Sequence, residues 1–477
     1  MANPASVNFE RDVSKALNDA QLRSNLKKAM SSLSLKRKAI FPDKTNFEQL
    51  RSIGNSIRRR ALSKLPELLE QLEQKCTANG IQVHWAETTA DANQLFLDII
   101  KSHDAKLAIK GKSMVSEEMH LNHALEENGV EVLETDLGEY IIQLDHETPS
   151  HIIVPAIHKN KDQIARLFHD KIPDTPYTEV VEELNAIART TLRQKFFAGE
   201  IGISGVNFAV AETGTLCLVE NEGNGRMCTT APDVHIAVMG LEKVVEHLKD
   251  VPPLLRLLTG SATGQLITTY FNMITSPRKA GEKDGPKEVH LVILDNGRSK
   301  MLADPELRET LQCIRCGACL NHCPVYTRLG GHAYGYVYPG PIGSILTPQM
   351  EGLDRAGAMA TASSLCGACE EVCPVKIPFT KILRILRNES YTAGDSPHSV
   401  KGNGYKKNLA ESVVWKGWAT MNTSPALNQM STKMLGMIGA YLPKLGPLKN
   451  WTSVRTMPKF AGKSLHAIAK ERGLSND

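Results

Sequence analysis

Two short cysteine-rich stretches decide how the C-terminal half of this chain folds. The first is CIRCGACLNHCPV, residues 313–325, and the second is LCGACEEVCPV, residues 365–375. Together they hold seven of the ten cysteines of the chain. The first follows the C-x2-C-x2-C-x3-C-P arrangement, in which three thiolates bind one cubane and the fourth reaches a second cluster. The spacing therefore predicts an iron–sulfur protein.

The second stretch is the same motif without its first cysteine. Ser363 stands where that cysteine would be, so two cubanes are offered seven thiolates in place of eight. Gly317 and Gly367 supply the backbone freedom of a tight turn, and Pro324 and Pro374 end it. The first stretch thus offers a complete motif and the second an incomplete one.

Other uses of cysteine fit this pattern less well. A zinc site of four thiolates is the main alternative, but the trailing prolines and the partial repeat disfavour it. A disulfide framework is disfavoured further, because a chain of 477 residues needs no stapling and its start, MANPASVNFERDV, carries no export signal.

Composition predicts an ordinary cytoplasmic protein. With 42% apolar residues the chain can bury a large core in two or three domains. No stretch reaches the roughly 18 apolar residues of a membrane span. The net charge is only +4, but residues 396–477 carry twelve basic and three acidic side chains beside Trp415, Trp418 and Trp451. Two interpretations of this tail are equally favoured: it docks a partner, or it is a solvated segment. Membrane contact is less favoured, and nucleic acid least, because no nucleic-acid motif accompanies the charge.

The order of expected elements predicts an α/β domain followed by a helical one. Residues 1–76 form a helical lead-in. Within 77–297, strands are expected at 81–86, 106–110, 130–134, 151–157, 206–212, 215–220, 234–240 and 288–294, with helices near 90–103, 115–128 and 159–170. Alternating strands and helices indicate a parallel sheet. Residues 298–392 form the cysteine-bearing helical domain, with a loop at 330–343 and helices at about 350–364 and 376–390, and 393–477 form a basic extension.

Three polar patterns in the α/β part are candidates for binding. In IKGKSM, residues 109–114, Lys110, Lys112 and Ser113 follow a strand and could meet an anion, although the motif is not a Walker A loop. In 211–226, Glu212, Glu220, Glu222, Asn221, Asn224 and Arg226 could line a polar pocket. TGSATGQ, residues 259–265, could hold a phosphate or carboxylate. Each pattern also has an ordinary explanation: solvated lysines for the first, a hairpin with a polar rim for the second and a plain loop for the third. The chain contains no G-x-G-x-x-G motif, so a Rossmann site has no support.

Five other side chains near these patterns have ordinary interpretations. Cys217 is expected to be a small buried hydrophobe. Cys228 is a weak candidate for the eighth cluster ligand, and Cys76 has no expected role. His322 and His332 lie close to the cysteines in sequence and could hydrogen-bond to a cluster or ligate it, but a structural role is the more common one for a lone histidine.

Four stretches, taken in order, resemble the lactate utilisation protein B family. They are residues 108–144, 209–224 (AVAETGTLCLVENEGN), 313–326 and 365–378 (LCGACEEVCPVKIP), and the resemblance covers nearly the whole chain. It implies an α/β LUD domain, similar to the sugar-isomerase and CoA-transferase class, joined to a helical two-cluster ferredoxin domain. It also implies two 4Fe-4S clusters, one held by Cys313, Cys316, Cys319 and Cys373 and the other by Cys323, Cys366 and Cys369.

The resemblance further implies a function. The family contributes the iron–sulfur electron-transfer subunit of a complex that oxidises L-lactate to pyruvate, with a cysteine-rich subunit and a LUD-only subunit as partners and a quinone as an expected acceptor. Such a protein is cytoplasmic or peripheral at the inner face of the membrane. One alternative is an electron-transfer subunit for the oxidation of another 2-hydroxy acid such as glycolate. The other is a regulatory or scaffold protein that contains the clusters. The second cluster, with three cysteines, is either a 3Fe-4S cluster or takes a ligand other than cysteine; a low-ranked hypothesis has its open iron bind the 2-hydroxycarboxylate.

Overall fold

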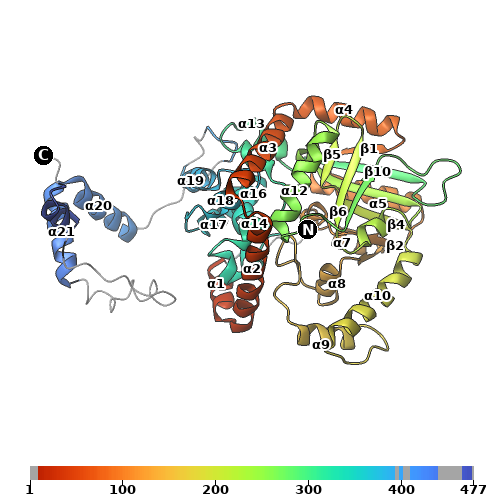
Figure 1. Ribbon diagram of the computed structural model, residues 1–477, viewed down its shortest axis with the longest axis horizontal. Helices are drawn as coiled ribbons and strands as arrows, with labels where there is room; N and C mark the ends of the chain where they lie inside the picture. The colour runs from red at the N-terminus through yellow and green to blue at the C-terminus, as the bar shows by residue number, and fades with distance from the viewer. Residues whose placement is uncertain (1–8, 393–396, 401–408, 439–462, 464, 475–477) are drawn as a thin grey trace. The chain divides into compact units, whose positions relative to one another are not determined.

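The computed structural model describes residues 9–392, 397–400, 409–438, 463 and 465–474 (Figure 1). The chain divides into two units, residues 1–404 and residues 405–477. The α/β part and the cysteine-bearing part both belong to the first unit.

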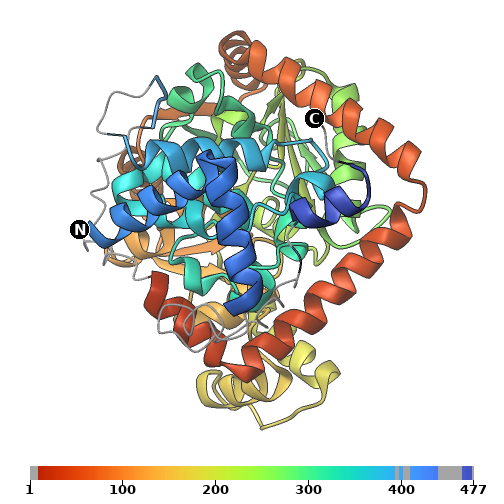
Figure 2. The ribbon, with the colours of Figure 1, turned by 90° about the vertical axis from the view of Figure 1, so that its left-hand side faces the viewer.

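The predicted helical lead-in consists of four helices. These are α1 (Phe9–Asn18), α2 (Ala20–Ile40), α3 (Lys44–Ser63) and α4 (Leu65–Ala78). The Asp19 and Asp43 side chains cap α2 and α3 by accepting backbone N–H groups of the first turn. Figure 2 shows α2 and α3 as the two arms of a V beside the cysteine-bearing segment. Both helices also contact α12 (Val251–Ala262) of the α/β part, so they bridge the two parts.

A six-stranded parallel sheet forms the centre of the α/β part, as the alternation of elements predicts. Its order is β1-β10-β7-β4-β2-β3, and its strands are β1 (Gln82–Ala86), β2 (Leu107–Lys110), β3 (Glu131–Glu134), β4 (Ile201–Gly205), β7 (Val234–Gly240) and β10 (Glu288–Leu294). The apolar runs of β7 and β10 are buried on both faces, which places them inside the sheet.

A smaller second sheet has the order β8-β5-β6-β9. Its strands are β8 (Val244–Val245), β5 (Phe208–Val210), β6 (Thr215–Glu220) and β9 (Tyr270–Ile274). The remaining helices of the α/β part are α5 (Thr89–Ser102), α6 (Met114–Glu118), α7 (Leu121–Glu126), α8 (Leu137–Leu144), α9 (Lys161–Lys171), α10 (Val181–Ala198) and α11 (Asn224–Cys228).

The prediction of a strand at 151–157 is wrong. These residues form bends and turns, and Pro155 has no N–H to give a sheet. The segment instead bonds to itself and to the cysteine-bearing part: the Tyr326 hydroxyl donates to the Ser150 carbonyl at 2.7 Å, and His151 Nε2 lies 3.0 Å from Asn321 Oδ1. Its apolar side chains, such as Ile152, are buried where the two parts meet.

The cysteine-bearing part is helical, and it has no strand among its described residues, as predicted. Its helices are α13 (Arg298–Ala303), α14 (Ala318–Asn321), α15 (Tyr326–Leu329), α16 (Gly340–Glu351), α17 (Leu353–Thr361), α18 (Ala368–Val372) and α19 (Phe379–Glu389), with short 3-10 turns at Arg308–Gln312 and His332–Tyr334. Helix α16 begins inside the expected loop at 330–343. The glycines and prolines of this stretch suggested a loop, but residues from Gly340 onwards form a buried helix. Gly343 packs against the carbonyl of Tyr338, and a Cβ at this position would lie only 1.7 Å from that oxygen, so the close packing requires glycine.

The second unit contains three described helices. They are α20 (Leu409–Thr423), α21 (Pro425–Ile438) and α23 (Leu465–Glu471). Trp415 and Trp418 lie on α20 with their side chains exposed, whereas Trp451 lies outside the described residues. No described helix combines the length and the apolar character that crossing a membrane would need.

Candidate iron–sulfur centre and the adjoining cavity

Four cysteines from the two stretches line one small cavity. Cys313, Cys316 and Cys319 approach from the first stretch and Cys373 from the second, although sixty positions separate Cys313 from Cys373. All four are buried and none forms a disulfide. The rest of the lining is mostly apolar and consists of Ile152, Ile314, Gly317, Ile342, Pro374, Val375, Ile377 and Phe379. Four convergent sulfurs in a mostly apolar pocket suit a four-iron cluster.

The other three cysteines form a second group. Cys323 and Cys369 are buried, and Cys366 is exposed. Burial, and next the neighbouring Cys323, raise the pKa of the Cys369 thiol to about 12. The backbone N–H of Ala368 has the opposite effect on Cys366 and lowers the pKa of its thiol. Cys319 of the first group also interacts with Cys369, so the two groups are neighbours.

The two stretches adopt the same turn. Arg315 and Gly317 have positive φ angles of 60° and 74°, and Leu365 and Gly367 have 55° and 80° at the matching positions. A positive φ is costly for arginine and leucine, so the turn needs outside support. In return it directs the N–H of Arg315 at Cys313 Sγ, 3.4 Å away. Beyond this turn, the N–H of Tyr326 at the start of α15 donates to Cys323 Sγ at 3.5 Å.

Positive side chains surround the first cysteine group. Arg37 interacts electrostatically with Cys316 and Cys373, and Arg58, Lys243 and Arg315 interact with Cys313. Because thiolate-bound clusters carry negative charge, buried cations nearby stabilise them and raise their reduction potential. The surroundings of the first group therefore fit an iron–sulfur cluster in charge as well as in donor set.

Ser363, at the position of the missing cysteine, closes the turn before Cys366. Its Oγ accepts the N–H of Leu365 at 3.1 Å, and its carbonyl accepts Arg387 Nη2 at 2.7 Å. The other candidate for an eighth ligand, Cys228, lies in the α/β part with its sulfur 3.4 Å from Thr135 Oγ1, away from both cysteine groups. His322 Nδ1 and His332 Nε2 bond to the carbonyls of Ala318 and Thr148, which gives both histidines a structural role.

A second, larger cavity of about 390 Å³ adjoins the first. It lies at the carboxyl ends of the strands, where open parallel sheets bind ligands: Lys112 follows β2, Asp136 follows β3, Gly205 ends β4 and Lys243 follows β7. Parts of all three polar sequence patterns line it. Arg315 and Tyr338 reach it from the cysteine-bearing part, and Ile152 lines both this cavity and the cysteine cavity.

The structure corrects the three polar patterns in detail. Lys110 is fully buried and pairs with Glu117 and Glu134 at 2.8 and 2.7 Å, so it cannot meet a ligand, whereas Lys112 and Ser113 line the cavity. From the second pattern, Glu212 lies elsewhere and accepts the N–H of Leu248, and Arg226 is exposed. The third pattern is not a plain loop, because residues 259–262 are the last turn of α12.

The buried end of the large cavity is built on Glu242. This fully buried carboxylate bonds Arg298 Nε at 2.7 Å and Arg315 Nη2 at 3.1 Å, and its backbone carbonyl accepts Arg58. The next residue, Lys243, is only 7% exposed, and its ammonium makes no hydrogen bond or ion pair with any described residue. Burial, and next the neighbouring Arg315, lower the pKa of Lys243 to about 7. Sequence reasoning missed both residues, because LEKVVE looks like any surface stretch.

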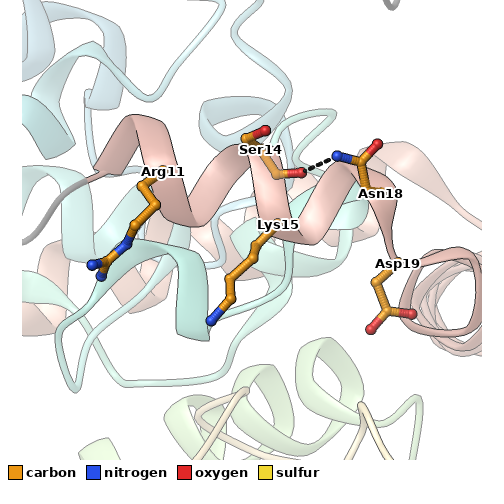
Figure 3. A pocket seen from close by; sticks show the side chains of 5 residues that line it. All are labelled: Arg11, Ser14, Lys15, Asn18 and Asp19. Atoms are coloured by element: carbon orange, nitrogen blue, oxygen red, sulfur yellow. Dashed lines mark hydrogen bonds between the residues drawn. The ribbon is translucent and has the colours of Figure 1, made fainter.

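A depression on α1 is larger in volume but is no enclosed site. Figure 3 shows its five side chains, Arg11, Ser14, Lys15, Asn18 and Asp19, which come from one helix and the residue after it. All five are exposed. We therefore place the candidate site in the enclosed cavity beside the cysteines.

Comparison with known proteins agrees with this architecture. Residues 69–294 match the LUD domain family, residues 309–377 match the 4Fe-4S dicluster domain, and residues 385–474 match the C-terminal family of lactate utilisation protein B. The chain therefore carries an iron–sulfur domain behind a LUD domain. Among solved structures, a DUF162 family protein from Deinococcus radiodurans covers 48% of this chain at 13% identity and a TM-score of 0.28, too low to support an argument.

Relatives match over nearly their whole length. Lactate utilization protein B of Bacillus subtilis strain 168 is 42% identical over 94% of this chain and 93% of its own, and that of Shouchella clausii is 41% identical over 97% and 95%. An uncharacterized electron transport protein, YkgF, of Escherichia coli K12 is 39% identical over 98% and 97%. On this similarity, with the LUD domain, the dicluster domain and the C-terminal region in the same order, the chain belongs to the lactate utilization protein B family.

Proposed function

We propose that this protein is the iron–sulfur electron-transfer subunit of a complex that oxidises L-lactate to pyruvate and allows growth on lactate. The observation that carries the proposal is the convergence of Cys313, Cys316, Cys319 and Cys373 on one cavity. The names of the relatives supply the substrate and the electron-transport role. Oxidation of lactate to pyruvate releases two electrons and two protons, and bound iron–sulfur clusters accept electrons singly.

The residues of this chain hold and tune two such clusters. Cys313, Cys316, Cys319 and Cys373 are the proposed ligands of the first 4Fe-4S cluster, and Cys323, Cys366 and Cys369 are those of the second. The N–H groups that donate to Cys313, Cys323 and Cys373, at 3.4 to 3.5 Å, stabilise the thiolates. Arg37 and Arg58 add positive charge on the side of the lead-in helices.

The complex would include a cysteine-rich subunit and a LUD-only subunit, with a quinone as the electron acceptor and no nucleic acid. We expect it in the cytoplasm or at the inner face of the membrane. The exposed Trp415 and Trp418 of α20 are available for such a partner.

Anaerobic reduction of the clusters tests the function. L-lactate added to the purified chain and both partner subunits should bleach the cluster absorbance, and glycolate should do so more slowly. A deletion strain should fail to grow on lactate and should grow normally on glycolate. Clusters that stay oxidised with lactate would favour a regulatory or scaffold role, and faster reduction by glycolate would favour that substrate.

The Ser363→Cys variant tests the composition of the second cluster. We propose that one iron position of this cluster has no cysteine ligand, so the variant should bind more iron per chain and should lose any 3Fe signal in electron paramagnetic resonance. Ser364→Cys, one position out of register, is the matched control. Identical iron content and spectra in the wild type and the Ser363→Cys variant would mean that no position is open.

A further inference from the structure

We propose that the 390 Å³ cavity binds a small monocarboxylate of the 2-hydroxy or 2-oxo acid class, with the ammonium of Lys243 as its counter-ion. The choice of acid rests on the proposed function, whereas the anion site itself rests on the geometry alone. The site lies on this chain, beside the first cysteine group, and needs no partner subunit to be complete.

Lys243 is the first reason. It is 93% buried and lines the cavity. Lysine is almost never buried to this extent unless its ammonium is paired, and the ammonium of Lys243 opens on the cavity without a hydrogen-bond partner among the described residues. An anion in the cavity would supply the missing partner.

The charges around the cavity indicate a single negative charge. The other two cations of the lining already face carboxylates: Arg315 bonds Glu242 at 3.1 Å, and Lys112 lies 3.9 Å from Glu139 and donates to the carbonyl of Ile153 at 2.6 Å. Of these three cations, Lys243 is the one that makes no hydrogen bond or ion pair with a described residue. A carboxylate carries one charge at neutral pH, whereas a phosphate carries nearly two.

Acidic residues of the lining also argue against a polyanion. Asp136, Glu220 and Glu222 all line the cavity, and Asn221 and Glu222 are exposed at its rim. Glu220 is held in place by the N–H groups of Gly225 and Arg226, at 2.6 Å each. These carboxylates would repel a nucleotide, while a small acid can pass them to reach Lys243.

Asn207 supplies a second polar contact. Its Oδ1 accepts the N–H of Val219 at 2.8 Å, which fixes the side chain, and its Nδ2 makes no hydrogen bond with any described residue. Because β5 and β8 pair in parallel with Ala209 opposite Val244, Asn207 and Lys243 lie at the same end of that ladder. An amide donor beside an ammonium suits the oxygen at C2 next to a carboxylate.

The cavity also lies close to the cluster ligands. Ile152 lines both cavities, and Arg315 lines the large one while its backbone N–H donates to Cys313 Sγ. A ligand at Lys243 would therefore be separated from the first cluster by about one layer of side chains. This is the arrangement that electron transfer from a bound acid would use.

Equilibrium dialysis of radiolabelled L-lactate against the full-length chain with its clusters reconstituted, under anaerobic conditions, tests the site. We expect binding to the wild type that pyruvate competes for and inorganic phosphate does not. Lys243→Met should weaken the affinity at least about tenfold, because it removes a charge-assisted hydrogen bond. The control is Lys249→Met, at an exposed lysine six positions later, which should bind like the wild type.

Asn207→Asp keeps the acceptor for Val219 and puts a negative charge in the cavity, so it should also weaken binding if Lys243→Met does not fold. The inference is overturned if the wild type binds no carboxylate, if phosphate displaces lactate, or if Lys243→Met and Asn207→Asp bind normally. If lactate reduces the clusters in the complex but both variants bind lactate like the wild type, this inference is wrong and the proposed function stands. If lactate binds specifically but does not reduce the clusters in the presence of both partner subunits, the proposed electron-transfer function is wrong instead.

Discussion

At the scale of single residues, the site depends on two kinds of side chain that differ in how visible they are in the sequence. The cluster cysteines can be recognised in the sequence, because a cubane needs sulfurs at fixed short spacings. Glu242 and Lys243 do not, because their role comes from burial among Arg58, Arg298 and Arg315. Although burial alone would raise it, Arg298 and then Arg315 bring the pKa of Glu242 down to about 2. Such a group keeps its charge in the folded protein at any ordinary pH.

The assignment of the first cluster predicts the effect of losing one ligand. Cys373→Ala should lower the iron bound per chain, because the first cavity loses one of its four sulfurs and the iron position that Cys373 serves loses its ligand. Cys217→Ala removes an equally buried cysteine of β6 that lies outside both cysteine groups, and it should leave the iron content unchanged. Colorimetric iron determination after anaerobic reconstitution checks both, and equal iron in Cys373→Ala and the wild type would contradict the assignment.

His235 predicts how stability depends on pH. This buried residue of β7 bonds Ser204 Oγ at 2.8 Å, and burial, with His290 nearby, lowers its pKa to about 3. An unfolded histidine takes up a proton near pH 6.5. The unfolded state therefore binds more protons below that pH, and stability should fall as the pH drops from about 6.5 towards 3, by up to about 1.4 kcal/mol per pH unit for this group.

Thermal melting at pH 7.5 and pH 5.5 measures this dependence. His235→Gln should lose less of its melting temperature between the two values than the wild type does. His123→Gln, at an exposed histidine of α7, should keep the wild-type dependence. An unchanged dependence in His235→Gln would mean that this residue takes up its proton without unfolding.

At the scale of elements, the lead-in helices hold the cysteine turns in place. Their helical character could be predicted from the sequence, but their role could not. From α3, Arg51 donates to the carbonyls of Cys373 and Glu370 at 2.7 and 2.8 Å, and Asn55 donates to that of Val375 at 2.8 Å. These bonds come from residues more than 300 positions away, and they support turns whose positive φ angles need support.

Arg51→Met should therefore weaken the hold on the clusters. The change leaves two backbone carbonyls without their donor, at a cost of about 1–3 kcal/mol. We expect iron to be released to a chelator several times faster than from the wild type. The exposed Arg59 of the same helix offers the control Arg59→Met, and equal release rates in the two variants would show that Arg51 is dispensable.

At the scale of the whole molecule, the α/β part and the cysteine-bearing part share one core. The buried residues of α3 and α4, of the small sheet and of α16 and α19 belong to a single apolar cluster. The cysteine cavity is closed on one side by Ile152, from a segment of the α/β part. The domain limits at 76, 297 and 392 stay predictions, and the lead-in and the two parts it bridges pack as one unit.

This shared core predicts how truncated chains behave. A fragment of residues 298–400 lacks Arg51, Asn55 and Ile152, so it should bind much less iron than the full chain after reconstitution. A chain of residues 1–404 keeps the whole first unit and should bind as much iron as the full chain. Iron per chain and near-ultraviolet circular dichroism measure both, and full iron binding by the small fragment would contradict the shared core.

The parallel α/β class, the helical cysteine-bearing part and the two cysteine-rich stretches could be predicted without a structure, because periodicity and short spacings are local properties of a chain. The prediction of 151–157 as a strand is wrong, since apolar letters do not tell which partner buries them. The fold shows that this segment lies between the cysteines and a second cavity, and that the ammonium of Lys243 bonds to no described residue there. Those facts depend on contacts between residues up to hundreds of positions apart, which arise only when the chain is folded.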